Sequence, residues 1–244
     1  MNLAKCLLFS ALVITNIYTH AGQLLNLDKY QVDKNETDSK YNTVLKSGKH
    51  DGVRFYQAVR EQEYNATAEK ILEIVLNFKS RCNNELSSKR IYDSKDFKCS
   101  HHNKGLIESK IIKQILPHKK DKNEIETYLV QRRVYNRELF EYYEVLRIFK
   151  VGKKTSVYTK MLTDKQASVF INGPKTRSTV LKEIQSVYTI EEVSKTKTKL
   201  SYTYLTTTDH WLLNKSVAVS QFFDGMVKSI NLFFNSVKTD ITRA

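Results

Sequence analysis

Residues 211–238 read WLLNKSVAVSQFFDGMVKSINLFFNSVK and contain no proline. Large apolar side chains recur in this stretch at spacings of three or four residues: Val219, Phe223, Met226, Ile230, Phe233 and Val237. This is the period of one face of an α-helix, and it predicts about seven helical turns. Asp209 is expected to cap the start of the helix, and Gly225 in its interior costs about 1 kcal/mol relative to alanine. A helix with such a wide apolar face needs an apolar surface to pack against.

The preceding part of the chain supplies that surface as a series of strands. Short runs rich in Tyr, Val, Ile, Thr and Phe alternate with charged turns, which is typical of an antiparallel meander. These runs cover residues 106–116, 125–135, 139–151, 156–162, 179–193 and 200–206. A strand over 53–60 and a helix over 66–79 with Thr67 as its cap come before them. We therefore predict an α+β fold, a curved antiparallel sheet of about six to seven strands around a long C-terminal helix.

The N-terminal segment indicates export. Residues 1–21 place Lys5 before an apolar run and end on Ala21, which is the plan of a secretory signal peptide. The run is shorter than the roughly 20 apolar residues that a membrane-spanning helix needs. A first core helix is the alternative interpretation. We expect a periplasmic or secreted protein that is soluble after cleavage.

The residues after this segment are polar and mixed in charge. We expect 22–51 to form a polar leader that ends in a short helix stopped by Gly48. The folded domain would then cover residues 52–240.

The composition limits the class of protein. The chain has 244 residues and a net charge of +14, and 41% of its residues are hydrophobic, too many for a disordered chain. It has three cysteines, of which Cys6 lies in the predicted signal peptide. Cys82 and Cys99 could form one disulfide, worth about 3 kcal/mol, or remain two free thiols.

Three stretches carry a resemblance to the START-like (steroidogenic-acute-regulatory-related lipid-transfer) domains of the helix-grip superfamily. Residues 52–56 (GVRFY) resemble the opening Gly-Val-x-x-Tyr strand, and residues 135–142 (YNRELFEY) resemble the central Asn-Arg-Asp-Phe-x-Tyr strand, with Glu138 in place of Asp. Residues 211–215 (WLLNK) resemble the Trp-Leu-Val-Asn-Lys that opens the terminal helix, with His210 where Pro is frequent. The three stretches occur in the expected order.

This resemblance implies that a lipid or another apolar small molecule binds between the sheet and the terminal helix. The residues expected to line such a cavity are Val219, Phe223, Met226, Ile230, Phe233 and Tyr142. A curved sheet with a helix across it forms a concave apolar site of the kind that ligands use. The alternative is that the same side chains are ordinary core.

Positive charge gathers in the predicted turns, at Lys119, Lys120, Lys122, Lys150, Lys153, Lys154, Lys195, Lys197 and Lys199. Such turns could touch anionic lipid headgroups, with Trp211, Leu212 and Lys215 as candidate membrane contacts. The alternative is that these are solvated turns that discourage edge-to-edge association. Nucleic acid is not an expected partner, because the aromatic residues follow core periodicities rather than a basic groove.

Catalytic and cofactor motifs are absent from the sequence, which has no phosphate loop, dinucleotide fingerprint, nucleophile elbow or zinc-protease helix. His101 and His102 near Cys99 have no recognised metal-ligand spacing. We therefore expect no cofactor and no metal. Glu138 and Glu144 fall on one face of a strand, where they would form cross-strand ion pairs or serve as an acid or base inside a cavity.

The sequence thus favours a non-enzymatic START-like carrier or sensor. Two alternatives stay open. One is a cyclase- or hydrolase-like enzyme of the same superfamily, and the other is a structural or interaction domain whose cavity is filled by side chains.

Overall fold

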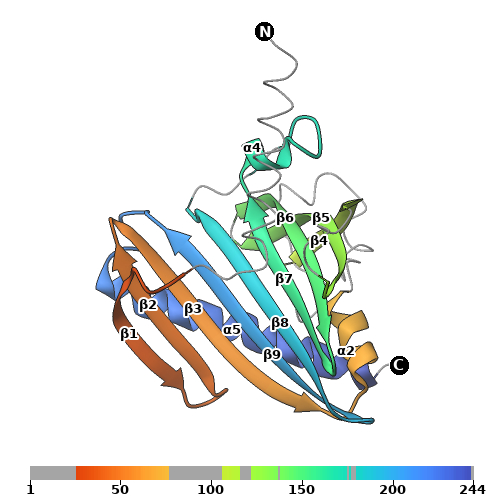
Figure 1. Cartoon of the computed structure of the whole chain (residues 1–244). Coiled ribbons are helices and arrows are strands. Elements are labelled where there is room, and N and C mark those ends of the chain that lie inside the picture. The colour runs from red at the N-terminus through yellow and green to blue at the C-terminus, as the bar shows by residue number, and fades with distance from the viewer. Residues whose placement is uncertain are drawn as a thin grey trace.

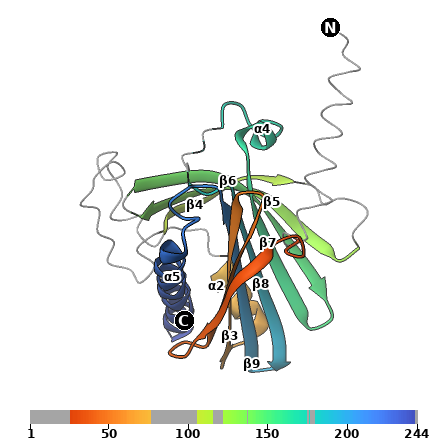
Figure 2. The ribbon, with the colours of Figure 1, turned by 90° about the vertical axis from the view of Figure 1, so that its left-hand side faces the viewer.

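The computed structural model describes residues 26–76, 106–115, 122–136, 138–174, 176 and 180–242. In these residues, nine strands form one antiparallel sheet, and the helix α5 (Ser216–Thr242) lies along its concave side (Figure 1). Figure 2 shows the sheet bending around α5, so that strands lie both beside and above the helix. The predicted α+β class and the curved sheet around a C-terminal helix are confirmed, with nine strands instead of six to seven.

The strands in chain order are β1 (Gln31–Asp38), β2 (Thr43–His50), β3 (Val53–Tyr64), β4 (Leu106–Ile115), β5 (Glu124–Asn136), β6 (Glu138–Val151), β7 (Lys154–Leu162), β8 (Glu183–Ser194) and β9 (Lys197–Thr208). Their order across the sheet is β1-β2-β3-β9-β8-β7-β6-β5-β4. The chain therefore crosses from β3 in the interior of the sheet to the far edge at β4, and the helix α2 (Ala68–Val75) lies on this crossing. The short helix α4 (Asp164–Ala167) follows β7.

The leader predicted for residues 22–51 is corrected over β1 and β2, which form the first hairpin of the sheet. The side chains of β1 are almost all exposed, so the strand lacks the alternation that would have marked it in the sequence. Gly48 stops no helix. It lies within β2, where an added Cβ would come within 2.5 Å of the Gln31 carbonyl oxygen. Asp51 and Gly52 then turn the chain into β3 with φ of 48° and 73°, as a tight hairpin turn requires.

The ends of the two main helices differ from the prediction in their details. Thr67 caps α2 as predicted, and its hydroxyl accepts a hydrogen bond of 3.2 Å from the Lys70 amide. The long helix begins at Ser216 rather than at residue 211. Asp209 lies seven residues before this start and so cannot cap the helix; its carboxylate forms an ion pair of 2.6 Å with Lys182.

The main core lies between α5, α2 and the concave face of the sheet. Phe223 and Phe234 of α5 are buried against Tyr56 and Tyr64 of β3, and the Tyr64 hydroxyl donates a hydrogen bond of 2.9 Å to the Phe234 carbonyl. A separate apolar cluster contains Leu129, Val145 and Leu162 together with Ala167 of α4. None of the helices in the described ranges is long and apolar enough to cross a membrane.

Several sequence predictions lie outside the described residues. These are the signal peptide over residues 1–21, the Cys82–Cys99 pair, and His101 and His102. They stay predictions.

Candidate functional site

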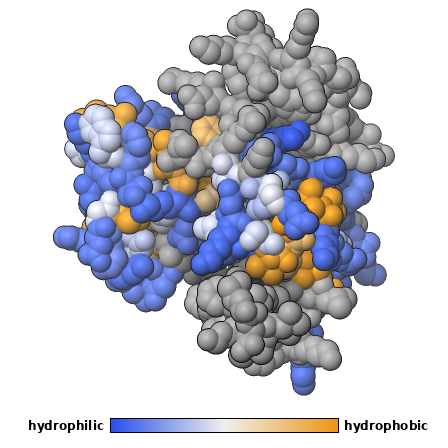
Figure 3. Space-filling view, turned by 90° about the horizontal axis from the view of Figure 1, so that it is seen from above, coloured by the Kyte–Doolittle hydropathy of each residue, from blue (hydrophilic) through white to orange (hydrophobic). Residues whose placement is uncertain are grey.

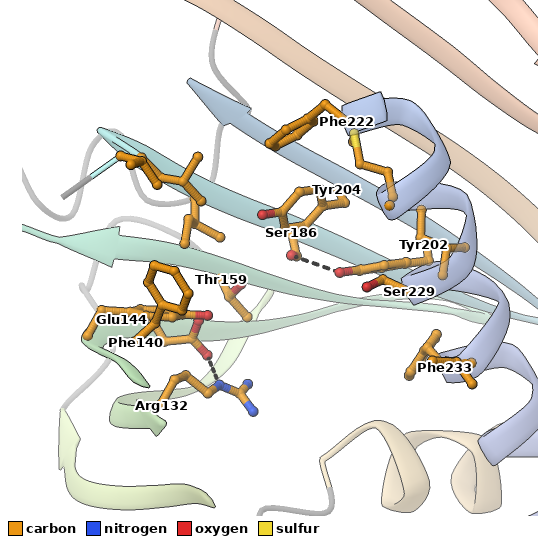
Figure 4. A pocket seen from close by; sticks show the side chains of 18 of the residues that line it. Arg132, Phe140, Glu144, Thr159, Ser186, Tyr202, Tyr204, Phe222, Ser229 and Phe233 are labelled. Carbon is orange, nitrogen blue, oxygen red and sulfur yellow. Dashed lines mark hydrogen bonds and ion pairs between the residues drawn. The ribbon is translucent and has the colours of Figure 1, made fainter. Parts of the chain in front are cut away.

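A cavity of about 550 Å³ lies between α5 and the strands β5 to β9 (Figure 4). The sheet side of its lining consists of Arg132, Phe140, Tyr142, Glu144, Thr159, Ile184, Ser186, Tyr188, Tyr202 and Tyr204. The helix side consists of Gln221, Phe222, Gly225, Met226, Ser229, Ile230, Leu232 and Phe233, and Val180 and Leu181 complete it ahead of β8.

On α5, the row of residues that faces the cavity lies beside the row that packs into the core. Met226, Ile230 and Phe233 line the cavity, as the sequence predicts. Val219 and Phe223 do not; they are buried in the main core. Successive residues of an α-helix differ in direction by about 100°. Two apolar stripes can therefore lie side by side, and the spacing in the sequence does not show which stripe faces the sheet and which faces the cavity.

The sheet wall is unusually rich in tyrosine. Tyr142 lines the cavity, as predicted, and Tyr188 and Tyr202 stack on each other with ring centroids 4.5 Å apart. Phe233 from the helix lies 5.4 Å and 5.2 Å from these two rings. Tyr188 of β8 and Tyr202 of β9 are direct partners across adjacent strands, and because alternate residues of a strand face the same side, both are placed on the cavity side of the sheet. The result is an aromatic wall opposite the apolar helix.

One ion pair is buried in this wall. The Arg132 Nε of β5 lies 2.6 Å from the Glu144 Oε1 of β6, and the two side chains are 16% and 4% exposed. Burial alone would lower the pKa of Arg132, but the Glu144 carboxylate outweighs it and raises that pKa above its usual range. The Arg132 guanidinium therefore keeps its charge inside the cavity, and it is held to Glu144 across neighbouring strands.

The phenol groups of the wall stay neutral at physiological pH. Burial raises the pKa of Tyr142 and Tyr188 well above the usual value, and it raises the pKa of Tyr202 and Tyr204 in the same direction. The Ser186 and Tyr202 hydroxyls lie 3.3 Å apart, within hydrogen-bond distance. These hydroxyls can therefore donate to or accept from a polar group of a bound molecule without adding charge.

Of the two carboxylates expected to pair across strands, Glu144 does so, and the side chain of Glu138 lies outside the described residues. Glu144 pairs with Arg132, and Glu141, on the other face of β6, lies 3.0 Å from Arg133. Among the cavity-lining residues that the structure describes, Glu144 is the single carboxylate, and it is engaged by Arg132. No three His, Cys, Asp or Glu side chains of the described residues converge as a metal site.

Several residues of the site are not apparent from the sequence. Arg132 and the tyrosines of β8 and β9 reach the cavity through the register of five neighbouring strands, β5 to β9. Alternation within one strand indicates which residues share a face, but it does not identify the neighbouring strand. Phe222 could have been found from its spacing of four and eleven to Met226 and Phe233 on the helix.

The candidate membrane contacts lie together just before α5. Trp211 is 66% exposed and Leu212 is 48% exposed, and the Lys215 amine lies 4.7 Å from the centre of the Trp211 ring. The face of the molecule in Figure 3 shows that hydrophilic residues dominate the surface and that apolar residues form separate patches. Trp211 and Leu212 are consecutive residues, and exposed apolar side chains that adjoin one another mark sites of contact.

Comparison with known proteins identifies the fold. No protein-family model and no curated protein sequence matches the chain. Among solved structures, human STARD10 matches with a TM-score of 0.50 and 10% identity over 93% of this chain and 81% of that chain. The lipid transfer and protein localization domain of human StarD13 (DLC2) has a TM-score of 0.45 and 13% identity, with 97% of each chain covered. The Zhui aromatase/cyclase from Streptomyces sp. R1128 has a TM-score of 0.43 and 10% identity, covering 77% of this chain and 96% of that chain. The chain has the START-like helix-grip fold.

Proposed function

We propose that this protein binds one molecule of a lipid or a similar, mostly apolar compound in the cavity and serves as its carrier or sensor. The observation that supports this most strongly is a cavity of about 550 Å³ with an apolar helix wall formed by Met226, Ile230 and Phe233. Sites for small ligands commonly enclose about 300–1,000 Å³ and are lined by apolar and aromatic groups with a few polar ones. In this proposal Tyr142 also contacts the ligand.

The buried ion pair restricts the chemistry of the ligand. Arg132 is already bound to Glu144 at 2.6 Å, so a ligand carboxylate would have to compete with a carboxylate of the protein. A hydroxyl, carbonyl or amide can instead bind at the pair or at the Ser186 and Tyr202 hydroxyls without disturbing it. We therefore expect a mostly apolar ligand with an uncharged polar group.

Native mass spectrometry of the purified protein, followed by lipid extraction, tests the proposal. A bound species that survives purification is the expected result. A competition assay with a fluorescent sterol or fatty alcohol should show stronger displacement by hexadecanol than by palmitate. Repeated recovery of empty protein, together with no uptake of either probe, would contradict the proposal.

A pair of helix variants links uptake to the cavity. Ser229→Phe places a large ring into the cavity from α5 and should abolish uptake. Asn235→Phe is the matched control, because Asn235 is an exposed residue of the same helix outside the cavity lining. Circular dichroism should show that both variants are folded. Equal uptake by the two variants would mean that the ligand binds elsewhere.

We also propose that the protein is exported, which rests on the pattern of residues 1–21 alone. Expression of the full chain in a cell with an intact secretion pathway should give an exported product that begins at Gly22. A mature product that retains Met1 would contradict this proposal.

A further inference from the structure

Three of the exposed large hydrophobic side chains of the described residues fall within residues 211–217. Trp211 is 66%, Leu212 is 48% and Val217 is 76% exposed. Single exposed hydrophobic residues are common on protein surfaces, but contiguous ones mark sites of contact. The three side chains bracket the start of α5, where Lys215 N donates to the Leu212 carbonyl and Ala218 N donates to the Lys215 carbonyl. We call residues 211–217 the elbow.

The backbone of the elbow is fixed to the sheet on its inner side. The Tyr56 hydroxyl donates a hydrogen bond of 2.5 Å to the Leu213 carbonyl, and the Asn214 side-chain amide donates one of 3.0 Å to the Gly52 carbonyl. A longer contact of 3.4 Å joins the Arg54 guanidinium to the Asn214 carbonyl. The elbow therefore holds its apolar side chains outward in a preset arrangement, and little conformational entropy is lost when they are covered.

The charges around the elbow suit an anionic partner. The Lys215 amine lies over the Trp211 ring, and no carboxylate of the described residues forms an ion pair with it. Two acidic groups nearby are paired with cations, since Asp209 lies 2.6 Å from Lys182 and Asp33 lies 2.7 Å from Arg54. The whole chain carries a net charge of +14, which adds a long-range attraction to negative surfaces.

We propose that the elbow is a docking site for the surface of an anionic lipid bilayer. Trp211 and Leu212 enter the interface between headgroups and acyl chains, Val217 follows on the first turn of α5, and Lys215 contacts the phosphate layer. Tryptophan is suited to this place because its ring is apolar and its N–H is polar. Lysine is suited to it because its charged end can reach the headgroups from an apolar stem.

Docking in this orientation brings one end of the cavity to the lipid. Phe222, one helical turn beyond the elbow, lines the cavity and stacks on Tyr56 with ring centroids 4.1 Å apart, and Tyr56 holds the elbow. On the other side, the Thr208 hydroxyl donates to the carbonyl of Val180, another lining residue. The docking site and the cavity wall are thus held by some of the same residues. Docking does not depend on a ligand being bound.

Trp211 makes a direct test possible, because it is the single tryptophan of the chain. Adding vesicles of phosphatidylcholine with about 30% phosphatidylserine should shift the tryptophan emission to shorter wavelength, and the shift should weaken in high salt. In cosedimentation with the same vesicles, Lys215→Gln should reduce the partition coefficient about fivefold. The double variant Trp211→Ala/Leu212→Ser should reduce it about tenfold or more.

The matched control is Val151→Ser, at the last residue of β6, where the side chain is 61% exposed and lies outside the elbow. This variant should bind vesicles as the unmodified protein does, and thermal unfolding should show that all variants are folded. Two results would overturn the proposal. One is an emission spectrum unchanged by anionic vesicles, and the other is equal binding by the elbow double variant and Val151→Ser.

Discussion

At the scale of single residues, the Arg132–Glu144 pair is the most consequential feature of the cavity. The Arg132 Nε and the Glu144 Oε1 are 2.6 Å apart, and the Glu144 side chain is 4% exposed. Removing charges from water is costly, and their mutual attraction offsets that cost only while both partners remain. The pair therefore has two consequences: the protein depends on Glu144 for stability, and a ligand has limited access to the positive charge of Arg132.

Glu144→Gln tests both consequences. The variant keeps the size of the side chain but removes the carboxylate from Arg132, so its free energy of unfolding should fall by about 3–5 kcal/mol. Palmitate should restore part of this loss, because its carboxylate can take the place that Glu144 leaves. Urea unfolding with and without palmitate, for the variant and the unmodified protein, measures the effect.

Glu141→Gln is the control for this experiment. Glu141 lies three residues before Glu144 on β6, and its carboxylate pairs with Arg133 at 3.0 Å. Neither Glu141 nor Arg133 lines the cavity. Its loss should lower stability less, because the pair is more exposed, and palmitate should not restore it. Equal rescue of both variants would show that palmitate binds outside the cavity.

At the scale of secondary-structure elements, two glycines differ in the space that an added Cβ would find around them. Gly225 lies in the interior of α5, and a Cβ added there would meet nothing within 4 Å. Gly225→Ala should therefore raise the free energy of unfolding by up to about 1 kcal/mol, the difference in helix propensity between the two residues. Chemical denaturation measures this change. A loss of stability would show that the cavity wall needs the glycine.

The same substitution at Gly48 should have the opposite sign. An added Cβ would lie 2.5 Å from the Gln31 carbonyl oxygen and 2.7 Å from the Phe55 ring, so β1 and β2 would have to move apart. Gly48→Ala should lower the free energy of unfolding by about 1–3 kcal/mol. If its denaturation curve matched that of the unmodified protein, the pairing of β1 with β2 would be wrong.

The elements also show what a sequence can and cannot predict. The long helix, its apolar stripe and the Thr67 cap follow from local periodicity and local hydrogen bonding, so they are predictable. The β1 strand is not, because its side chains are exposed and its partners are supplied by tertiary structure. The sequence predicts Phe223 in the cavity lining, whereas the structure places Phe222 there and Phe223 in the core. The two side chains differ by one residue along α5, and packing against the sheet determines which of them faces the cavity.

At the scale of the whole molecule, the curved sheet determines where the cavity lies. Next to α2 and β3, α5 side chains such as Phe223 and Phe234 fill the space between the helix and the sheet. Near β5 and β6 the sheet bends around the helix (Figure 2), and the cavity there is lined by Arg132, Tyr142 and Glu144. Arg132 could not be identified from the sequence, because its place depends on this bend and on the register between strands.

The buried tyrosines make the stability of the whole molecule sensitive to alkaline pH. Burial raises the pKa of Tyr56 to about 12 and that of Tyr142 well above its usual value. A group whose pKa is higher in the folded chain than in the unfolded chain contributes stability that is fully present below the unfolded pKa, about 10 for tyrosine. That stability is lost as the pH rises through the folded pKa.

The free energy of unfolding should therefore fall as the pH rises from about 10 to about 12, with exposed tyrosines ionising first and buried ones ionising only as the protein unfolds. Ultraviolet absorbance of tyrosinate and urea unfolding, measured on the same samples, separate the two groups. Tyr142→Phe removes one buried phenol, so its stability should decline less steeply over this range. A single ionisation midpoint near the unfolded value, in protein that remains folded, would mean that water reaches the cavity wall freely.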